Sequence, residues 1–548
     1  MTAGFDPESH QVPVPPMRWD AWGDPELAAP LSEGTSTLIR GMLGVSGEVT
    51  LPTVDPTTVA VSPSRLSDAD LASLRAIVGD EWVSAADADR LLRAGGKSTP
   101  DLLRRRRPEQ DAPDAVVVPA TDDEVVALLA WCAQNRVAVV PFGGGTSVVG
   151  GVDPEAGELR AAVSVDLRRM DALLDLDEVS QIATLGAGVT GPDAERLLGE
   201  RGYSLGHFPQ SFRYATIGGF AVTRSSGQAS AGYGRFDDMV QALTLITPQG
   251  VLEAGRSPKN AVGPDLRQLV MGSEGALGIV TRVSLRVHRV PEMTEYEGWR
   301  FDSFAAAAAA FRAVAQEGVM PTVMRVSDEV ETALNLARPT EIGESENSDD
   351  DLPDKGVPGG CLAITTFEGS PSAVSARAGV VREIFTAQGG QSLGDAPART
   401  WEHGRFSGPY LRDALLDIGV GCETLETVTT WAKLDEVKAA VTASLTEVLP
   451  EPTVVMCHIS HTYATGASLY FTVVYRQDGD ALDQWLAAKR QVTATLAEIG
   501  ASITHHHAVG RDHQPWLADE IGELGVDVLR AVKGALDPAG VCNPGKLV

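Results

Sequence analysis

The sequence predicts an α+β protein in which two regions of alternating strands and helices follow an extension of helices and loops. Three observations carry this prediction. The chain has 548 residues, which is enough for several domains. Its composition, 43% hydrophobic and 22% charged, is ordinary for a folded protein. Short apolar runs that end in glycine loops alternate with stretches of helical pattern. No run approaches ~20 apolar residues, so no membrane-spanning helix is expected.

Charge and cysteine content exclude several classes of function. A net charge of −29 disfavours nucleic acid as a partner, because an acidic surface repels phosphates. The five cysteines lie far apart without a C-x-x-C pair, which indicates neither a disulfide scaffold nor a thiolate zinc site. The N-terminus lacks the pattern of a secretory signal, and Gly545–Val548 does not match a Ser-Lys-Leu ending. We therefore expect a cytoplasmic protein; peripheral membrane contact and a homodimer stay open.

Residues 1–111 are expected to form the helical and loop extension. Its first part is rich in proline, whereas Leu66–Leu92 has a helical pattern with a cap at Ser67–Asp70. The run Arg104–Arg107 has two interpretations: a solvated turn before the next domain, or a basic surface for an anionic partner.

Residues 112–290 form the first α+β region. Val116–Pro119 is expected to be a strand, Thr121 to cap a helix that runs to Asn135, and Val137–Val140 to be a second strand. Further strands are expected at Val163–Leu167, Ile182–Leu185, Leu243–Ile246 and Gly278–Val287.

Residues 291–500 form the second α+β region, and residues 501–548 form a C-terminal segment. Helices are expected at Phe304–Gln316, Val374–Gln388, Leu434–Leu449 and Asp480–Ile499, and strands at Met324–Val326, Leu362–Phe367 and Leu469–Tyr475. The acidic stretch Glu344–Gly360, rich in proline and glycine, is expected to be a mobile loop.

Three loops rich in glycine and hydroxyl side chains lie within 112–290. Pro141–Ser147 directly follows a strand, and its successive glycines let backbone N–H groups converge on an anion. Gln210–Gly227 and Gly272–Thr281 have the same character. The spacing is neither that of the ATPase P-loop nor G-x-G-x-x-G, so both folds are disfavoured. Together the loops could wrap an extended ligand with a diphosphate in its middle.

The order P-x-G-G-G-T-S, T-I-G-G and G-S-E-G-x-L-G-I-V-T resembles the FAD-binding proteins of the vanillyl-alcohol-oxidase (PCMH) type. The resemblance implies a two-subdomain FAD-binding fold at 112–290, an α+β cap or substrate domain at 291–500, and a segment at 501–548 that closes the active site. The first loop has no histidine that could bond a flavin, so we expect FAD to be non-covalent. The implied cofactor-binding residues are Pro141, Phe142, Gly143, Gly144, Gly145, Thr146, Ser147, Gln210, Ser211, Thr216, Gly218, Gly219, Thr223, Arg224, Ser225, Ser226, Glu274, Gly275, Gly278 and Ile279.

The segment Thr504–Gly510 contains three adjacent histidines. Only alternate residues of a strand share a face, so the three cannot all point one way, and a surface histidine cluster is the plain alternative. In the branch of the superfamily that oxidises D-2-hydroxy acids, a metal-binding Glu stands where this chain has His506. The H-x-G-D-G-N-x-H stretch of that branch has no match within Cys457–Tyr470. No catalytic metal is therefore expected.

The string H-H-H-x-V-G instead resembles the alkylglycerone-phosphate synthase family. Arg18–Gly23, Tyr410–Asp413, and Thr462–Ala467 with Tyr470-Phe471 resemble further motifs of that family. The resemblance implies ether lipid synthesis by an FAD-dependent transferase, which exchanges the acyl group of acyl-dihydroxyacetone phosphate for a fatty alcohol without net redox turnover. Two stretches depart from the family, Arg511–His513 and Cys542–Leu547, and the second is closer to the ending of hydroxy-acid dehydrogenases.

The same resemblance implies catalytic roles for Tyr470, His505, His506 and His507, and substrate binding by Arg412. A guanidinium fork suits a phosphate, and His506 is the candidate acid–base group, since imidazole titrates near neutral pH. Tyr470 relays a proton or orients the carbonyl, His507 adds a phosphate donor and His505 supports the strand. Core packing for Tyr470 and a neutral hydrogen bond for His507 are alternatives. An FAD-linked oxidase or dehydrogenase of a 2-hydroxy acid or alcohol is the alternative function.

Overall fold

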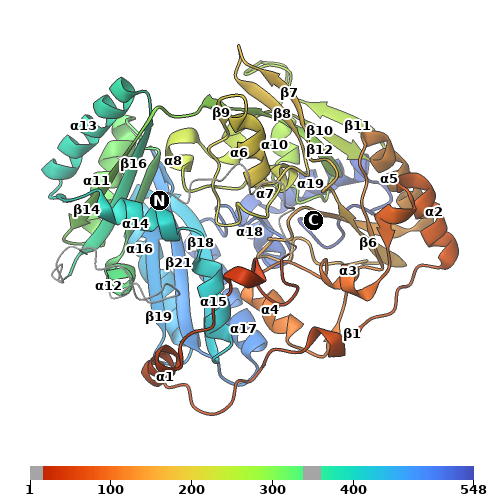
Figure 1. Cartoon of the computed structure of the whole chain (residues 1–548), viewed down its shortest axis with the longest axis horizontal. Coiled ribbons are helices and arrows are strands. Elements are labelled where there is room, and N and C mark those ends of the chain that lie inside the picture. Colours follow the sequence, from red (N-terminus) through yellow and green to blue (C-terminus); the bar gives the residue numbers. More distant parts are fainter. Residues whose placement is uncertain (1–16, 337–358) are drawn as a thin grey trace.

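The structure, a computed structural model, describes residues 17–336 and 359–548. Most of the expected loop Glu344–Gly360 lies outside this range. Figure 1 shows two halves side by side: one built mainly from the part of the chain before β14 (Met293–Phe301), and the other from most of the rest. Three larger sheets form their framework. No helix within the described ranges is both long and apolar enough to cross a membrane.

The first sheet has a parallel core. β4 (Ala115–Val117), β6 (Ala161–Asp166) and β5 (Val137–Phe142) pair in parallel, and β2 (Val83–Ser84) joins β4 antiparallel. Two helices cover it and begin where the sequence predicts. The Thr121 hydroxyl caps α5 (Asp122–Asn135), and Ser67 with Asp70 forms a capping box at α2 (Asp68–Val78). Apolar side chains of these elements share one core.

The second sheet is antiparallel, in the order β11, β10, β12, β8, β7. Its three inner strands match predicted ones: β10 (Val240–Thr247), β12 (Ile279–Arg286) and β8 (Ile182–Gly186). The edge strands β7 (Leu173–Asp177) and β11 (Gly250–Ala254) were not predicted. Both are largely exposed, so neither carries the apolar run that marks a buried strand. Short helices α6 (Gly191–Gly199), α7 (Ile217–Thr223) and α10 (Arg267–Val270) pack around this sheet.

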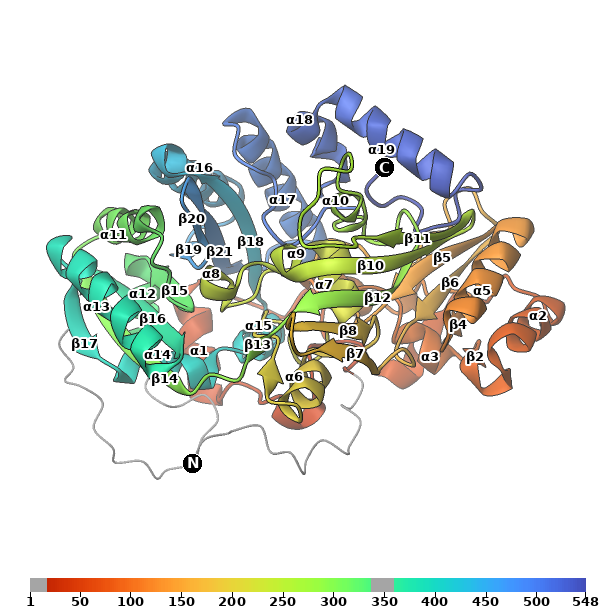
Figure 2. The ribbon, with the colours of Figure 1, turned by 90° about the horizontal axis from the view of Figure 1, so that it is seen from above.

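The third sheet is the largest, with eight antiparallel strands. Its strands are β14 (Met293–Phe301), β15 (Val323–Ser327), β16 (Cys361–Gly369), β17 (Gln391–Gly394), β18 (Val420–Thr430), β19 (Val454–Ile459), β20 (Thr462–Tyr463) and β21 (Gly466–Arg476). The covering helices are α11 (Phe304–Glu317), α13 (Pro371–Ala387), α16 (Leu434–Val448) and α17 (Ala481–Glu498), close to their predicted bounds. In Figure 2, α11 and α16 lie on the outer side of this sheet, away from the first two sheets.

The two faces of the third sheet have different roles. In β21, Leu469, Phe471 and Val473 are fully buried in the core under the helices. Tyr470 and Thr472 alternate with them and line a cavity on the opposite face. Because side chains alternate along a strand, the period of two separates core from cavity wall.

The structure contradicts both interpretations of the arginine run Arg104–Arg107. Arg105 and Arg106 are only 3% and 6% exposed. Arg106 donates to the Leu416 carbonyl and pairs with Asp417, at the end of α15 (Gly408–Leu416), while Arg107 pairs with Asp480. Arg106 and Arg107 thus attach the end of α4 (Thr99–Arg105) to the second half, while Arg105 donates to the Gly95 carbonyl, so the run is neither a solvated turn nor a basic surface.

Both outer segments of the chain contribute to the core of the first sheet. The backbone of Val139 in β5 bonds to Val541 and Asn543, at 2.8 Å each, so Cys542 lies beside a strand from a much earlier part of the chain. The division at positions 111, 290 and 500 stays a prediction. Side chains of α2 and β2, which precede the first predicted boundary, and those of Val541 and Cys542 all pack into the core of the first sheet.

Candidate functional site

A cavity of about 3510 Å³ runs from the three glycine loops to the inner face of the third sheet. It brings together most of the sequence-predicted site residues. Tyr470, His506, His507 and Arg412 line it, as do all the cofactor candidates except Arg224 and Ile279. His505 lies behind the wall, 6% exposed.

The first two loops are interlocked through glycine. A Cβ on Gly144 would stand 2.0 Å from the carbonyl oxygen of Tyr214, and one on Gly143 would stand 2.4 Å from the Thr216 hydroxyl. No side chain fits at either position. The backbone of the first loop is therefore bare where it meets the cavity, so its N–H groups can approach a ligand directly. This cradle fits the diphosphate and ribitol of a flavin dinucleotide.

The third loop connects the cradle to the histidine segment. Glu274 is buried, and its carboxylate accepts the backbone N–H groups of Val509 (3.0 Å) and Gly510 (2.6 Å). Burial raises the pKa of Glu274 to about 7. Asn543 donates to the Glu274 carbonyl, which ties the loop to the C-terminal segment as well. A residue expected to contact the cofactor thus also fixes one end of the histidines.

Arg224 and Ile279 lie away from the cavity. The Arg224 guanidinium donates to the Met271 carbonyl (3.0 Å) and pairs with Asp237 (3.1 Å), behind α7. Ile279 is 1% exposed and belongs to the core of the first sheet. Their cofactor roles stay predictions.

One buried carboxylate organises the histidine segment. Glu426 in β18 accepts the backbone N–H groups of His505, His506 (3.1 Å) and His507 (2.9 Å), and also the Thr504 hydroxyl (2.7 Å). Burial works to raise the pKa of Glu426, but the neighbouring imidazoles and this hydroxyl together hold it well below its usual range. Glu426 is therefore ionised and folds three consecutive residues around itself.

The aromatic rings stand in a row at the cavity wall. Tyr470 lies parallel to His458 (centroids 4.8 Å) and to His506 (6.0 Å), and edge-on to His507 (5.8 Å). His506 and His507 place Nδ1 3.8 Å and 3.7 Å from the Glu426 carboxylate. Tyr470 faces the cavity and the histidines are not on the molecular surface. The core-packing and surface-cluster interpretations are therefore wrong.

His505 is held by hydrogen bonds on both sides of its ring. Its Nε2 lies 2.6 Å from the Tyr463 hydroxyl, and its Nδ1 lies 3.0 Å from Nδ1 of His506. Arg235 donates to the His505 carbonyl. Tyr463 comes from the T-Y-x-x-G-A motif, so that motif supports the histidine segment from β20.

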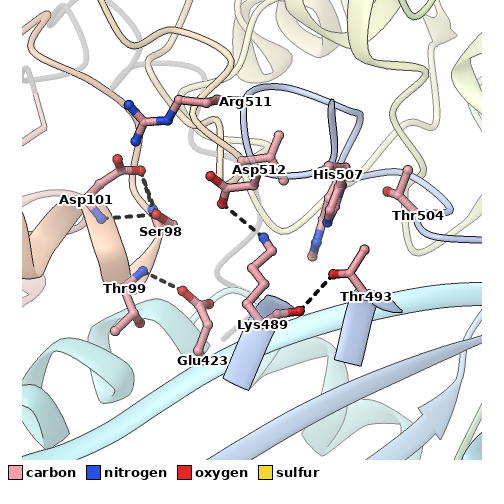
Figure 3. Close-up of polar contacts among 12 residues, drawn as sticks. Ser98, Thr99, Asp101, Glu423, Lys489, Thr493, Thr504, His507, Arg511 and Asp512 are labelled. Carbon is pink, nitrogen blue, oxygen red and sulfur yellow. Dashed lines mark hydrogen bonds and ion pairs between the residues drawn. The ribbon is translucent and has the colours of Figure 1, made fainter. Parts of the chain in front are cut away.

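The wall behind His507 is polar (Figure 3). Lys489 of α17 lies beside His507 and pairs with Asp512 (3.1 Å). Nearby, the carboxylate of Glu423 in β18 accepts the backbone N–H of Thr99 at the start of α4. Two buried carboxylates of one strand thus anchor two distant segments, the histidines and α4.

Burial sets the protonation of the ring cluster. It lowers the pKa of His506 against the opposing charge of Glu426, and it lowers the pKa of His507 to about 3. It raises the pKa of Tyr470 to about 12. At neutral pH the imidazoles therefore offer lone pairs to accept a proton, and the phenol carries its own proton.

Arg412 extends into the cavity from α15. Its Nε donates to Asp413 (2.9 Å) and its Nη1 to the Lys97 carbonyl (2.6 Å). Its buried Nη2 is 2.8 Å from Asp413 Oδ1 yet has no hydrogen-bond partner among the described residues. Asp413 and the Lys97 carbonyl thus hold the guanidinium in place, and the ion pair at Nη2 leaves the hydrogen-bonding capacity of that nitrogen unused.

The N-terminal motif Arg18–Gly23 packs directly behind Arg412. The backbone N–H of Trp22 donates to the Asp413 carboxylate (2.6 Å), and the backbone N–H of Asp24 donates to the Tyr410 hydroxyl (3.1 Å). Gly23 has φ +69°, and a Cβ there would stand 2.2 Å from that hydroxyl, so only glycine fits. Two motifs that lie far apart in the sequence therefore form one support for the guanidinium.

Sequence reasoning missed Glu426, although a signal existed. The run Val420–Thr430 is rich in valine and threonine, which is typical of a strand, and only its two glutamates are charged. A carboxylate inside such a run has to find buried partners. The partners, backbone N–H groups of residues 505–507, are visible only in the fold.

Comparison with known proteins agrees with this architecture. Residues 113–255 match the family of FAD binding domains, and residues 290–547 match the C-terminal domain of FAD linked oxidases. The solved structure of p-cresol methylhydroxylase shares the fold, with a TM-score of 0.68 at 16% identity over 88% of this chain and 98% of that one. The expected vanillyl-alcohol-oxidase-type fold and FAD as cofactor are confirmed.

Two relatives are similar over nearly their whole length. The chain is 32% identical to alkyldihydroxyacetonephosphate synthase of Dictyostelium discoideum, over 99% of this chain and 95% of that protein. A solved alkyldihydroxyacetonephosphate synthase superimposes with a TM-score of 0.80 at 30% identity, over 96% of this chain and 98% of that one. The chain therefore belongs to the alkyldihydroxyacetonephosphate synthase family of FAD-dependent enzymes.

Proposed function

We propose that this enzyme exchanges the acyl group of acyl-dihydroxyacetone phosphate for a fatty alcohol and so makes the ether bond of ether lipids. The observation that carries the proposal is the juxtaposition in one cavity of the Arg412 guanidinium, the two neutral imidazoles of His506 and His507, and the protonated phenol of Tyr470. The reaction needs a phosphate site, a proton acceptor beside a ketone and room for alkyl chains. The cavity offers each of these next to the flavin cradle.

Arg412 holds the substrate phosphate. A guanidinium remains charged at every physiological pH and presents its N–H groups in a fixed plane, which suits a phosphate. Asp413 and the Lys97 carbonyl fix the orientation of that plane, so little side-chain entropy is lost on binding. His507 adds a second donor when its Nδ1 or Nε2 carries the proton.

His506 accepts the proton removed from the carbon beside the ketone. Its lowered pKa keeps the ring neutral near pH 7, and Glu426, 3.8 Å from Nδ1, stabilises the imidazolium that forms. Tyr470 donates its hydroxyl proton toward the ketone oxygen and orients the carbonyl. When bound, FAD supplies an electron-accepting ring at the reacting carbon, and it is oxidised before and after the exchange.

The atoms balance without an external oxidant. The acyl group leaves as a carboxylate, the alcohol oxygen takes its place on carbon, and the alcohol proton is released. The proton that His506 holds returns to the substrate carbon. Apolar side chains that line the cavity, including Leu411, Leu415 and Met456, suit the alkyl chains.

The test is to incubate the FAD-loaded enzyme with palmitoyl-dihydroxyacetone phosphate and hexadecanol. We expect equal amounts of alkyl ether and free palmitate, with the flavin spectrum oxidised throughout. His506→Gln is expected to stop ether formation, while His288→Gln, on a histidine outside the cavity, serves as the matched control. Anaerobic bleaching of the flavin by a 2-hydroxy acid, with no ether product, would instead support the dehydrogenase alternative.

We also propose that the enzyme touches a lipid bilayer through α1 (Glu33–Met42). Thr35, Leu38, Ile39 and Met42 form one face of this helix and line the cavity together with Leu31, which precedes the helix. Leu38 and Met42 are nevertheless 64% and 66% exposed. An exposed apolar face at the mouth of a lipid-binding cavity suits an uncharged membrane surface, given the acidic chain.

Flotation with phosphatidylcholine vesicles tests this contact. Leu38→Glu with Met42→Glu is expected to reduce the vesicle-bound fraction severalfold. Leu524→Glu, on the exposed face of α19 (Glu523–Leu536), is the control because its side chain is 77% exposed and lies away from the cavity. Equal flotation of all three proteins would contradict the proposal. The cytoplasmic location and the homodimer stay predictions.

A further inference from the structure

Three histidines from two segments meet at one point of the cavity wall. His461 follows β19, and His505 and His506 belong to the histidine segment. One ring nitrogen of each lies within 4.8 Å of the others. His461 and His505 are 5% and 6% exposed, and the His506 side chain is 16% exposed where it faces the cavity.

The hydrogen bonding of these rings is incomplete. His461 Nδ1 is buried and has no partner among the described residues, which is costly for a polar atom. The Nδ1 atoms of His505 and His506 are 3.0 Å apart and can share only one proton between them when both rings are neutral. The three rings thus bring nitrogen lone pairs together without enough hydrogen-bond donors to satisfy all of them.

We propose that His461, His505 and His506 bind a divalent transition-metal ion, with zinc the best fit, and that the bound ion inhibits the enzyme. Neutral imidazole is the form that ligates metals. Zinc takes nitrogen ligands at about 2.0–2.1 Å in a tetrahedron, so it requires ligand atoms about 3.4 Å apart. The ring nitrogens lie within 4.8 Å of one another, so ring rotations on binding have to shorten the longest separation by up to about 1.4 Å. The cavity supplies the fourth position for a water molecule.

The surrounding charges favour a moderate affinity. The ionised Glu426 lies 3.8 Å from His506 Nδ1 and offsets part of the metal charge. Arg235, which donates to the His505 carbonyl, opposes it. Glu426 also fixes the backbone of both adjacent histidines, so the site is largely preformed.

The enzyme is inhibited because the metal ion and the transferred proton both need the lone pair of the His506 imidazole. His506 is the proton acceptor in the proposed exchange, so this part of the inference rests on the proposed function. A metal ion bound to one ring nitrogen of His506 leaves a hydrogen on the other nitrogen, so the ring has no lone pair left to take the proton. It also places a positive charge where the imidazolium has to form.

Zinc binding is measured directly by equilibrium dialysis of chelator-treated, FAD-loaded enzyme. We expect one zinc ion per chain, and at least about tenfold weaker binding by His461→Gln and by His505→Gln. His403→Gln, on an exposed histidine of α14 (Ala396–Gly404), is the matched control and should bind zinc as the unchanged enzyme does. Flavin absorbance and melting temperature report whether each variant is folded.

The inhibition is measured as ether formation against free zinc. The concentration for half inhibition should rise in His461→Gln by the same factor as the dissociation constant. Absence of saturable zinc binding, or unchanged binding by both ligand variants, would overturn the site. Binding without inhibition would overturn the regulatory part. Absence of ether product without zinc would count against the proposed function alone, since the dialysis result stands by itself.

Discussion

The flavin cradle and the histidine cluster are built in opposite ways. The cradle is made of backbone, and its shape requires glycine at positions 143 and 144, where any side chain would clash with the second loop. The cluster is made of side chains from β18, β19, β21 and residues 504–510, held by a single carboxylate. A contiguous motif can specify the first kind of site. The second exists only after strands distant in sequence have paired.

The largest expected effect is on the cradle. Gly144→Ala should abolish FAD binding and all activity, because the new methyl group would stand 2.0 Å from the Tyr214 carbonyl. Gly199→Ala, at the end of α6, is the matched control, because a methyl group there meets nothing within 4 Å and Gly199 does not line the cavity. Flavin content per chain after gel filtration distinguishes them. Full flavin content in Gly144→Ala would show that the loops are not interlocked in this way.

A large effect on turnover is expected in the cluster. His506→Ala should lower kcat by about 10²–10⁴-fold through loss of the proton acceptor, while FAD stays bound because the glycine loops are untouched. Single-turnover ether formation and the flavin spectrum measure the two separately. If His506→Ala lost FAD instead, the cluster would be a structural support of the cradle.

Arg412→Lys should weaken substrate binding more than flavin binding. Lysine keeps the charge but loses the planar fork, which costs about 1.5–3 kcal/mol for a charged hydrogen bond. The expected result is a raised KM with unchanged flavin content. The unchanged enzyme should also bind a non-phosphorylated analogue more weakly than the phosphate ester. Equal affinity for the two would remove Arg412 from the phosphate site.

The pH dependence reports on Glu426. The pKa of His506 in the folded protein lies below 6.5, so the neutral base persists to that pH and the rate falls as pH drops further. Glu426 raises this pKa, and a charge at such short distance shifts a pKa by about 1–3 units. Glu426→Gln should therefore move the acid limb to lower pH by about one unit. Glu423→Gln, on the same strand, should leave it in place.

Two treatments, acid precipitation and a chelator, are expected to leave no covalent flavin and to cause no loss of activity. Acid precipitation should release all the flavin, because Pro141–Ser147 contains no side chain that forms a flavin bond. A chelator should leave the activity unchanged or raise it, since no metal is expected to take part in the exchange. Colour retained in the protein pellet would contradict non-covalent binding. Activity lost to the chelator and restored by stoichiometric zinc would contradict a metal-free reaction.

The sequence predicts the cradle far better than the cluster. Glycine loops after apolar runs, and helix caps at Ser67 and Thr121, are local signals that survive in the fold. Strands β14 and β18 escaped prediction because each carries charged residues in an otherwise regular pattern. Those residues are satisfied by partners far away in sequence, such as Glu297 by Arg382 and Glu426 by residues 504–507.

The pairing of Cys542 with Val139 also constrains the order in which the newly made chain can fold. The cradle loop leaves the ribosome long before the segment that completes its sheet, because most of the chain lies between them. At about 5–20 residues per second, translation of that interval takes about 20–80 s. During this time β5 has an unpaired backbone edge beside the glycine loop. We therefore expect flavin loading to follow synthesis of the C-terminal segment, and the half of the molecule that is synthesised first to need protection from aggregation in the meantime.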